Sequence, residues 1–431
     1  MFFCQNRHAC NVRELVVRAV ASRRAGYRRT PPITAVFAAC MLAALAWFIT
    51  PFVVRSDERA RSFVPVEAPT KPVELRGATP KLLSLSPQQC VWVRNRVQPP
   101  DDGRLTPSMC LHLMLLHGTE MEVKTPRSNL CASLLDTILN DQLGAEFFGA
   151  PALLKTRYGL RFRPNSPVDG SSEAHRDQCL AALGELEVPL GHPVLLGNEE
   201  LAVRDILNDS LATFHLAQDD IAWTAQAYAA YLPPACSWRN SFNEPFSFDD
   251  LTVELLDRPV NETSCFGMHL LISQAAIARA DEQIKILSPV VRSRLIRRIS
   301  DVVAACVASQ GPDGSWGPEW YGDTVRHSPM PASDPPFEGA RLLMTAHVAD
   351  WIQALPAELK VPGAVRRRAG ESLIACLRSA SQKELSELFC PYSHAACTVL
   401  RWAGVPFNRP ARGATEAGAV NSRTSPTSPK S

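Results

Sequence analysis

Apolar and polar positions recur with the period of an amphipathic helix through most of the C-terminal half of this chain. From Ser288 to Ala308, apolar residues return every three to four positions with arginines between them. Pro312 prevents that helix from continuing, and Pro, Gly or polar breaks separate similar segments along the chain. These segments predict helices at 199–215, 220–232, 248–257, 266–281, 288–309, 339–354, 363–379 and 392–403.

The polarity of these predicted helices alternates. The segments 288–309 and 363–379 are amphipathic and rich in arginine, whereas 220–232 and 266–281 contain mostly apolar or small residues. An amphipathic helix buries one face, and a helix that is apolar on all sides is buried completely. We therefore expect an all-α domain with apolar helices inside and amphipathic helices outside.

Residues 85–198 carry a weaker signal. The segments 107–118, 128–141 and 173–186 have helical patterns, whereas 147–164 has the character of irregular loop or short strand. We assign these residues to the same helical domain, which then spans 85–405, without predicting how many helical hairpins they form.

An uncharged, mostly apolar run of 22 residues, Ile33–Val54, precedes this domain. About 20 such residues are enough to cross a bilayer as a helix. Seven arginines and a single acidic residue lie before the run, and the flank after it is nearly neutral. Because positive charge stays on the cytoplasmic side, the pattern predicts a single-pass membrane anchor with a cytoplasmic basic segment, 1–32, and a main domain outside the cytoplasm.

Two alternatives to an uncleaved anchor are a cleaved signal peptide and a buried helix. Against cleavage, the basic segment and the apolar run are longer than those of most signal peptides, and no small-x-small site follows the run. Against a buried helix, the run has no polar stripe. Residues 55–84 are rich in proline and predict a linker, and 406–431 lack the apolar residues needed to fold and predict a disordered tail.

Charge and cysteine content narrow the classes of partner and the expected crosslinks. The formal net charge is +2, and the basic N-terminal segment leaves the remainder slightly acidic, which argues against nucleic acid as a partner. Cysteines in the main domain are irregularly spaced, and several lie in apolar helical patterns where a thiol is usually a small buried hydrophobe. An oxidising location would permit one or two disulfides, but the spacing does not predict a disulfide framework.

The segment 309–317, SQGPDGSWG, joins two predicted helices. A Gln amide can bond free backbone groups at a neighbouring helix end, and a Trp ring can pack over it. The segment resembles the repeat motif of squalene cyclases and protein prenyltransferases, and the resemblance extends over residues 265–402. It implies an α/α toroid, in which helical hairpins form a ring around a central cavity.

The acid motif of the squalene cyclases has no match in this chain. Those enzymes carry an Asp-x-Asp-Asp sequence that protonates the terpene, and the nearest pairs here are Asp219-Asp220 and Asp249-Asp250. Each pair is also typical of the start of a helix, where capping and the helix dipole favour negative charge. The resemblance therefore points to the superfamily fold rather than to one particular enzyme.

Protein prenyltransferases hold zinc with an Asp, a Cys and a His on inner helices, and a similar set occurs here. Cys265 and His269 begin one predicted inner helix, and Cys390 and His394 begin another. A helix places residues four apart on one face, and thiolate and imidazole are zinc ligands. These four residues are candidate metal ligands. The alternative is two unrelated buried thiols and two hydrogen-bonded histidines.

A third histidine, His347, lies midway along a further predicted inner helix, with Asp350 one turn later. If the inner helices run parallel, His269 and His394 lie at one end of the cavity with Tyr392 nearby, and His347 lies about 10 Å deeper. Imidazole, phenol and carboxyl groups that converge can act as general acids and bases. These five residues are the candidate catalytic set.

Three classes of function are consistent with this sequence. The first is a membrane-anchored toroid that binds a ligand or an extracytoplasmic partner in its central cavity. The second is a lyase or hydrolase of extracytoplasmic polysaccharide, and the third is a terpenoid cyclase or a prenyltransferase-like enzyme. The missing acid motif counts against cyclisation, and the outward topology counts against prenylation, whose diphosphate substrates are cytosolic. We favour the first class and leave catalysis open, because a fold alone does not specify an activity.

The charge asymmetry around Ile33–Val54 makes the topology testable. A reporter enzyme that works only outside the cytoplasm should be active when it is fused after Ser431, and a reporter that works only inside the cytoplasm should be inactive at the same position. Paired fusions, one active only inside and one only outside the cytoplasm, measure this directly. Activity of the cytoplasmic reporter would contradict the predicted orientation.

Overall fold

A computed structural model describes residues 66, 68–69, 71–76, 81–99, 105–124, 130–164, 173–260, 265–321 and 339–405. The chain divides into two compact units, 1–62 and 63–431, and all described residues belong to the second. The predicted basic segment 1–32, the anchor Ile33–Val54 and the tail 406–431 lie outside them and stay predictions. Within the described ranges, no helix has both the length and the apolar character to span a bilayer.

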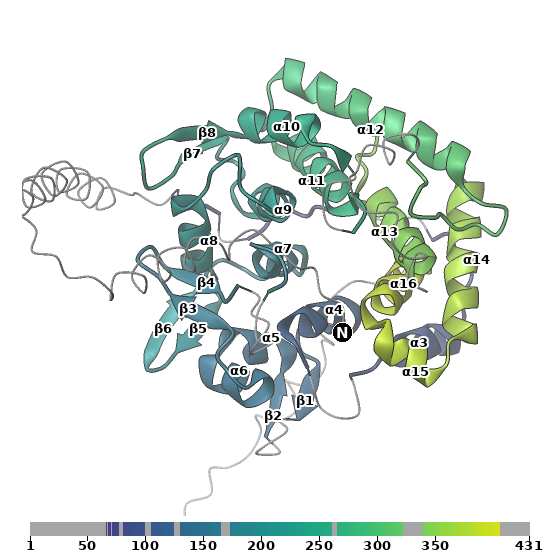
Figure 1. The fold of residues 1–431 in the computed structure, drawn as a ribbon, viewed down its shortest axis with the longest axis horizontal. Coiled ribbons are helices and arrows are strands. Elements are labelled where there is room, and N and C mark those ends of the chain that lie inside the picture. The colour runs from purple at the N-terminus through teal and green to yellow at the C-terminus, as the bar shows by residue number, and fades with distance from the viewer. Residues whose placement is uncertain are drawn as a thin grey trace, which may run out of the picture. The chain divides into compact units, whose positions relative to one another are not determined.

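The described residues contain 14 helices and eight short strands, which confirms the all-α class (Figure 1). The strands form four separate two-stranded antiparallel hairpins. These are β1 (Glu122–Lys124) with β2 (Cys131–Ser133), β3 (Leu153–Lys155) with β4 (Leu160–Phe162), β5 (Pro193–Leu196) with β6 (Glu199–Ala202), and β7 (Ser237–Arg239) with β8 (Pro245–Ser247).

Six helices contact one another in a closed order. They are α4 (Pro107–His117), α7 (Gln178–Glu185), α9 (Ile221–Tyr231), α11 (Met268–Ile284), α13 (Ala340–Ala354) and α16 (Phe389–Trp402). Each contacts the next, and α16 contacts α4, so the series closes on itself. Figure 1 shows these six helices around the middle of the second unit. We call them the inner helices.

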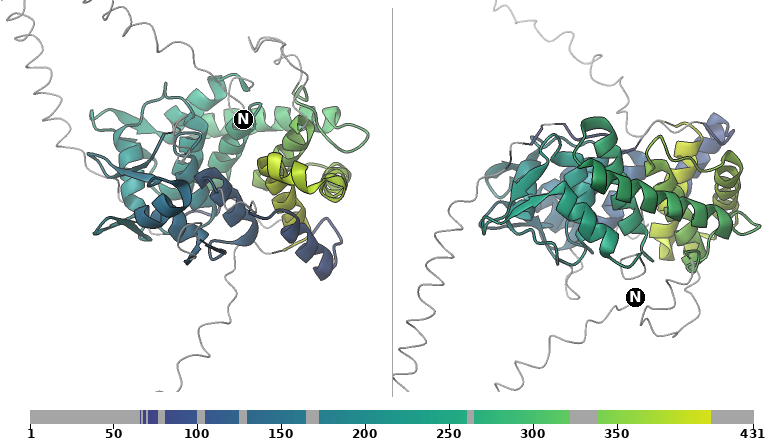
Figure 2. Two further views of the ribbon diagram at one scale, coloured as in Figure 1. Left: turned by 60° about the horizontal axis from the view of Figure 1, so that its bottom comes forward. Right: turned by 90° about the horizontal axis from the view of Figure 1, so that it is seen from above.

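The other helices pack outside the inner set (Figures 1 and 2). They are α3 (Pro87–Arg96), α5 (Leu134–Leu139), α6 (Asp141–Phe148), α8 (Val203–Ala212), α10 (Phe248–Asp257), α12 (Pro289–Ser309), α14 (Gly363–Ser379) and α15 (Gln382–Glu387). Contacts join α5 to α4, α8 to α7, α12 to α11, and α14 to both α13 and α16. Helix α12 lies across the front of the right-hand view in Figure 2.

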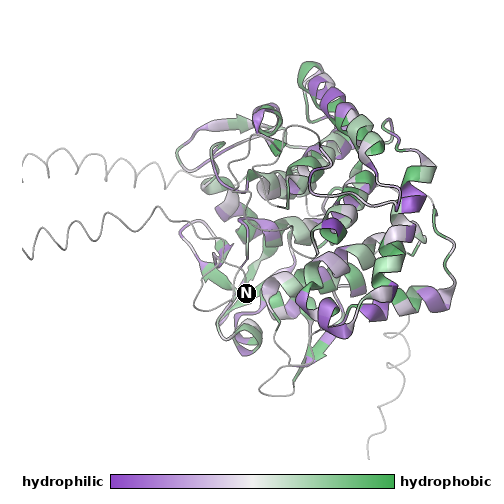
Figure 3. Ribbon diagram, turned by 45° about the vertical axis from the view of Figure 1, so that its right-hand side comes forward, coloured by the Kyte–Doolittle hydropathy of each residue, from purple (hydrophilic) through white to green (hydrophobic). Residues whose placement is uncertain are grey.

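Burial follows the polarity pattern of the sequence. In α13 only Arg341 is exposed, whereas α12 buries a single stripe, made by Val291, Leu295, Ile299, Val302 and Cys306. Polar and apolar residues therefore alternate along α12, the helix at the top of Figure 3. This confirms the expectation that apolar helices lie inside and amphipathic helices outside, because burial on all sides leaves no favourable place for charge.

The prediction of a free linker at 55–84 is wrong for its described part. Val73, Leu75 and Leu83 are buried in the hydrophobic core. The Val73 amide donates to the Ala230 carbonyl oxygen at 2.8 Å, and the Leu83 amide donates to the Trp402 carbonyl oxygen at 2.9 Å. Prolines prevent helix formation here, but they do not prevent an extended segment from burying the apolar residues between them.

Two predicted helix boundaries are wrong because short hairpins replace the ends of the helices. Residues 199–202 form strand β6, and α8 begins only at Val203. Gly197 adopts a positive φ of 60°, which turns the chain between β5 and β6. Residues 131–133 likewise form β2, whereas the predicted loop or strand at 147–164 is confirmed by the β3–β4 hairpin.

The cyclase-like segment 309–317 joins three helices. The Gln310 Nε2 group donates to the Val365 carbonyl oxygen of α14 at 2.9 Å. The indole N–H of Trp316 donates to the Cys306 carbonyl oxygen of α12 at 2.9 Å, and the Trp316 amide donates to Thr345 Oγ1 of α13 at 3.0 Å. The Trp316 ring thus satisfies a free carbonyl at the C-terminal end of α12, as the sequence predicted, whereas Gln310 bonds to a first-turn carbonyl of α14 that is not a free helix-end group.

All ten cysteines of the described residues are free thiols. The alternative of one or two disulfides is therefore not found in this part of the chain. Cys110, Cys179, Cys306 and Cys397 are buried and behave as small hydrophobic residues.

Trp316 should be a strong determinant of stability, because its ring is only 1% exposed and its N–H is bonded. We expect Trp316→Ala to lower the free energy of unfolding by about 3 kcal/mol or more. Val290→Ala is the control, since Val290 on α12 is 72% exposed and its loss should cost less than about 0.5 kcal/mol. Denaturant unfolding measures both. Equal stabilities for the two variants would contradict a structural role for the segment.

Candidate functional site

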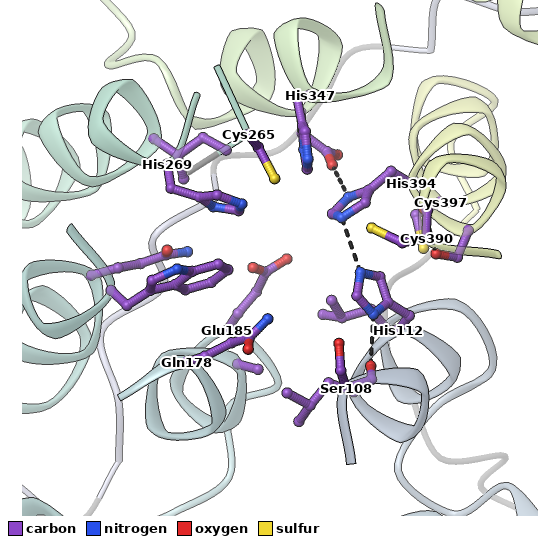
Figure 4. Close-up of a pocket in the computed structure, with 18 of the residues that line it drawn as sticks. Ser108, His112, Gln178, Glu185, Cys265, His269, His347, Cys390, His394 and Cys397 are labelled. Carbon is purple, nitrogen blue, oxygen red and sulfur yellow. Dashed lines mark hydrogen bonds and ion pairs between the residues drawn. The ribbon is translucent and has the colours of Figure 1, made fainter. Parts of the chain in front are cut away.

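The inner helices surround a pocket of about 230 Å³ (Figure 4). Each of the six contributes at least one lining residue. These include His112 of α4, Gln178 of α7, Gln226 of α9, His269 of α11, His347 of α13 and His394 of α16. The pocket therefore depends on segments that are far apart in the sequence.

Four histidines form a continuous series along one side of this pocket. The ring centroids of His269 and His347 are 5.1 Å apart, those of His347 and His394 are 4.2 Å apart, and those of His394 and His112 are 4.9 Å apart. The three predicted histidines are thus brought together. The expected depth of His347 is wrong, because it assumed that the inner helices begin at the same level.

His112 is a site residue that the sequence interpretation missed. It lies in the apolar segment 107–118, which the sequence interpretation did not assign as an inner helix. The reasoning that selected His347, a histidine inside an apolar helix, applies equally to His112 and would have found it. Tyr392 does not line the pocket and is buried in the core, whereas Asp350 does line it.

Hydrogen bonds orient two of the four imidazole rings (Figure 4). His394 Nδ1 lies 2.8 Å from Asp350 Oδ2, and His112 Nδ1 lies 2.6 Å from the Ser108 carbonyl oxygen. Each Nδ1 must carry a proton to donate to these oxygens. The two Nε2 atoms are then left 3.2 Å from each other.

Burial and neighbouring charges give the four rings different pKa values. Burial, reinforced by the charge of His394, holds the pKa of His269 and of His347 well below the usual value. Burial likewise lowers the pKa of His112. Burial would also lower the pKa of His394, but its hydrogen bond to Asp350, its interaction with Cys390 and the charge of Asp350 together outweigh burial and raise the pKa. His269, His347 and His112 are therefore neutral near pH 7 and carry lone pairs.

A buried ionic network closes the pocket beside His394. Arg401 Nη2 lies 2.9 Å and Arg76 Nη2 lies 2.7 Å from Glu185 Oε1, and Arg401 Nη1 lies 3.3 Å from Asp350 Oδ1. Burial would raise the pKa of Asp350, but the hydrogen bond from His394 and the charges of both arginines hold it well below its usual range. Arg76 comes from the segment predicted as linker, and no sequence signal marked it.

Three sets of side chains place their ligand atoms within 4.8 Å of one another, close enough to share a metal ion. They are Cys265, His269 and His347; His112, Cys390 and His394; and His347, Asp350 and His394. The four ligands predicted from the sequence, Cys265, His269, Cys390 and His394, do not form one of these sets. They are divided between the first two, and each Cys-His pair gains a histidine from a neighbouring helix.

The two Cys-x-x-x-His pairs also differ from their expected conformations. Cys390 and His394 both lie in α16, because Pro391 falls in its first turn, where no backbone N–H is needed. Cys265 lies before α11, in a turn where Cys265, Phe266 and Gly267 have φ angles of 52°, 54° and 84°. The expectation that Cys265 and His269 share one helix is therefore wrong, and so is the expectation that Pro391 makes the second pair partly non-helical.

Neither acidic pair considered for cyclase chemistry lines the pocket. Asp249 and Asp250 lie in the first turn of α10, and Asp250 completes a capping box with Ser247, as the capping alternative predicted. Asp220 makes no side-chain cap to α9 and instead contacts His175 Nδ1 at 3.0 Å. The capping interpretation is therefore wrong for Asp220.

Glu185 should be essential for stability, because Arg76 and Arg401 are largely buried and both face it. We expect Glu185→Gln to lower the free energy of unfolding by about 3–5 kcal/mol, since a buried charge loses a partner. Glu187→Gln is the control, because the Glu187 side chain is 52% exposed and should contribute less than about 1 kcal/mol. Chemical denaturation compares the two. A neutral Glu185→Gln would contradict the inferred strength of the network.

The ligand of this pocket has to be inferred from its own side chains. Protein-family models give no match to this chain, and neither the curated proteins nor the solved structures contain a match.

Proposed function

We propose that the helical domain is an α/α toroid that binds a zinc ion in its central pocket through His112, Cys390 and His394. The observation that carries this proposal is the pair of Nε2 atoms 3.2 Å apart. Both rings have their Nδ1 proton directed to an oxygen, so two lone pairs would face each other if both rings were neutral. A cation between or beside the two nitrogens removes that repulsion.

The distances fit a tetrahedral zinc site. Zinc binds imidazole nitrogen at about 2.0–2.1 Å, so two nitrogens on one tetrahedral ion lie about 3.3 Å apart. The Cys390 sulfur lies within 4.8 Å of a ring nitrogen of His112 and of one of His394. Two imidazoles and a thiolate are ligands that suit zinc.

The surroundings of the two histidines support the same assignment. A histidine that binds a metal usually donates its other N–H to a carboxylate or a backbone carbonyl. His394 donates to Asp350, and His112 donates to the Ser108 carbonyl oxygen. Asp350 is in turn held by Thr398 Oγ1 at 2.9 Å. Both rings are thus oriented before any ion binds.

Three protein ligands leave a fourth tetrahedral position for a ligand. Zinc sites of this kind bind small molecules or water at the open position, in contrast to closed sites with four protein ligands. The pocket volume of about 230 Å³ limits that ligand to a small molecule. We therefore propose zinc-assisted binding of a small ligand, with the membrane-anchored arrangement predicted from the sequence as its setting.

Three features support the toroid part of this proposal. The contacts of the inner helices close into a ring, the outer helices are amphipathic, and segment 309–317 bonds to helix ends. The terpenoid-cyclase alternative gains no support, because neither acidic pair lines the pocket. A polysaccharide needs an extended groove, and the enclosing side chains leave space for a small ligand only.

Elemental analysis of the purified full-length protein tests the zinc site. We expect bound zinc, and we expect His112→Ala and Cys390→Ser each to lose at least one equivalent, because each removes one of three ligands. His215→Ala and Cys131→Ser are matched controls, since both side chains are exposed and should leave the zinc content unchanged.

Removal of the metal should also lower stability, because a ligand that binds the folded state stabilises it. A chelator should therefore lower the Tm of the wild type by more than it lowers that of Cys390→Ser. Metal-free wild-type protein with a Tm that chelator does not change would contradict the proposal. The short contact would then be a hydrogen bond from a protonated His394 to His112, which the raised pKa of His394 permits.

A further inference from the structure

His347 is buried without a hydrogen bond to either of its ring nitrogens. Its side chain is fully inaccessible, and neither Nδ1 nor Nε2 has a partner among the described residues. A buried polar atom without a partner costs about 1–3 kcal/mol, so such atoms are rare unless an ion or a water satisfies them. Its ring packs between the rings of His269 and His394, and neither of these contacts is a hydrogen bond.

His269 shares this property. Its Nδ1 is buried without a partner, and its ring is 5% exposed and packs against Trp223 at a centroid distance of 4.0 Å. One ring nitrogen of His269 and one of His347 lie within 4.8 Å of each other and of the Cys265 sulfur.

The backbone at Cys265 adopts a strained conformation that fixes the position of its thiol. Cys265 and Phe266 both have a positive φ, which costs a residue with a side chain about 1–2 kcal/mol. Gly267 continues the left-handed turn, and a Cβ atom there would lie 2.0 Å from the Val260 carbonyl oxygen. This turn directs Cys265 to the pocket beside His269 (Figure 4). Strain of this kind persists mainly where a functional position requires it.

We propose that Cys265, His269 and His347 bind a second zinc ion, so that the pocket holds a two-metal centre. This inference rests on the proposed zinc site at His112, Cys390 and His394, and adds a separate site to it. Each site then consists of one thiolate and two imidazoles. One ion binds between α11 and α13, and the other binds between α16 and α4.

The two sites are close enough to act on one ligand. The His347 and His394 rings, which belong to different sites, have centroids 4.2 Å apart. Asp350 lies within 4.8 Å of a nitrogen of each. Both ions keep an open position toward the shared pocket, and pairs of metal ions about 3.5–4 Å apart commonly bind one ligand between them.

Charge also permits two ions in this buried pocket. Arg76 and Arg401 are already balanced by Glu185 and Asp350. A cysteine binds zinc as the thiolate, so Cys265 and Cys390 would each release a proton when zinc binds. The two thiolates supply part of the negative charge that two Zn²⁺ ions require. Anionic groups on the shared ligand supply the rest.

Zinc stoichiometry of the full-length protein tests this inference. We expect two zinc ions per chain in the wild type, one in Cys265→Ser, one in Cys390→Ser and none in the double variant. Cys131→Ser is the matched control and should keep two, because its thiol is exposed on β2. One zinc in the wild type, unchanged by Cys265→Ser and lost in Cys390→Ser, would overturn the second site and leave the first intact. No zinc in the wild type would overturn both.

Cobalt titration of metal-free wild-type protein gives a readout that needs no variant to fold. The thiolate-to-Co²⁺ absorption band should grow until two equivalents are bound, since each site has one cysteine. Saturation at one equivalent would overturn the two-metal centre. The same titration of Cys265→Ser should end at one equivalent with about half the final absorbance.

Discussion

The carboxylate of Asp350 connects the inner helices to the chemistry of the pocket. Asp350 lies on α13. It accepts hydrogen bonds from His394 and Thr398 of α16, and it pairs with Arg401, which is also on α16. A buried carboxylate of this kind is stable only while its partners stay in place. Asp350 therefore sets both the tautomer and the direction of the His394 ring, and the Nε2 atom of that ring faces His112. The proposed ligand geometry depends on this one arrangement.

The buried polar groups of this pocket lower the folding stability of a domain whose inner helices are otherwise apolar. Four histidines and an ionic network occupy positions that leucine or alanine would fill in a domain built for stability alone. The ionic groups pair with one another, whereas both ring nitrogens of His347 and Nδ1 of His269 are buried without a hydrogen bond among the described residues. In the proposed sites a metal ion would replace these missing hydrogen bonds, and folding would then be coupled to metal binding at the same side chains.

The segment before α3 also belongs to the pocket. Lys71–Arg76 packs an extended strand of chain against the inner helices, and its last residue supplies a guanidinium to Glu185. The charge balance of the pocket therefore includes a residue, Arg76, that lies outside the inner helices and the helices packed around them.

The pattern of the sequence predicted the helical class, four of the six inner helices, the amphipathic helices 288–309 and 363–379, and the bonding of Gln310 and Trp316 to neighbouring helices. Those features follow from local periodicity and from residues near one another in the chain, so pattern alone predicts them. It also identified His269, His347 and His394, because a histidine inside an apolar helix is conspicuous. Only the tertiary structure decided which residues meet. His112 and Arg76 join the pocket from distant segments, and the four predicted metal ligands are divided between two sets. Contacts between helices arise from packing, which depends on the whole chain at once, and no local pattern encodes the distance between two side chains on different helices.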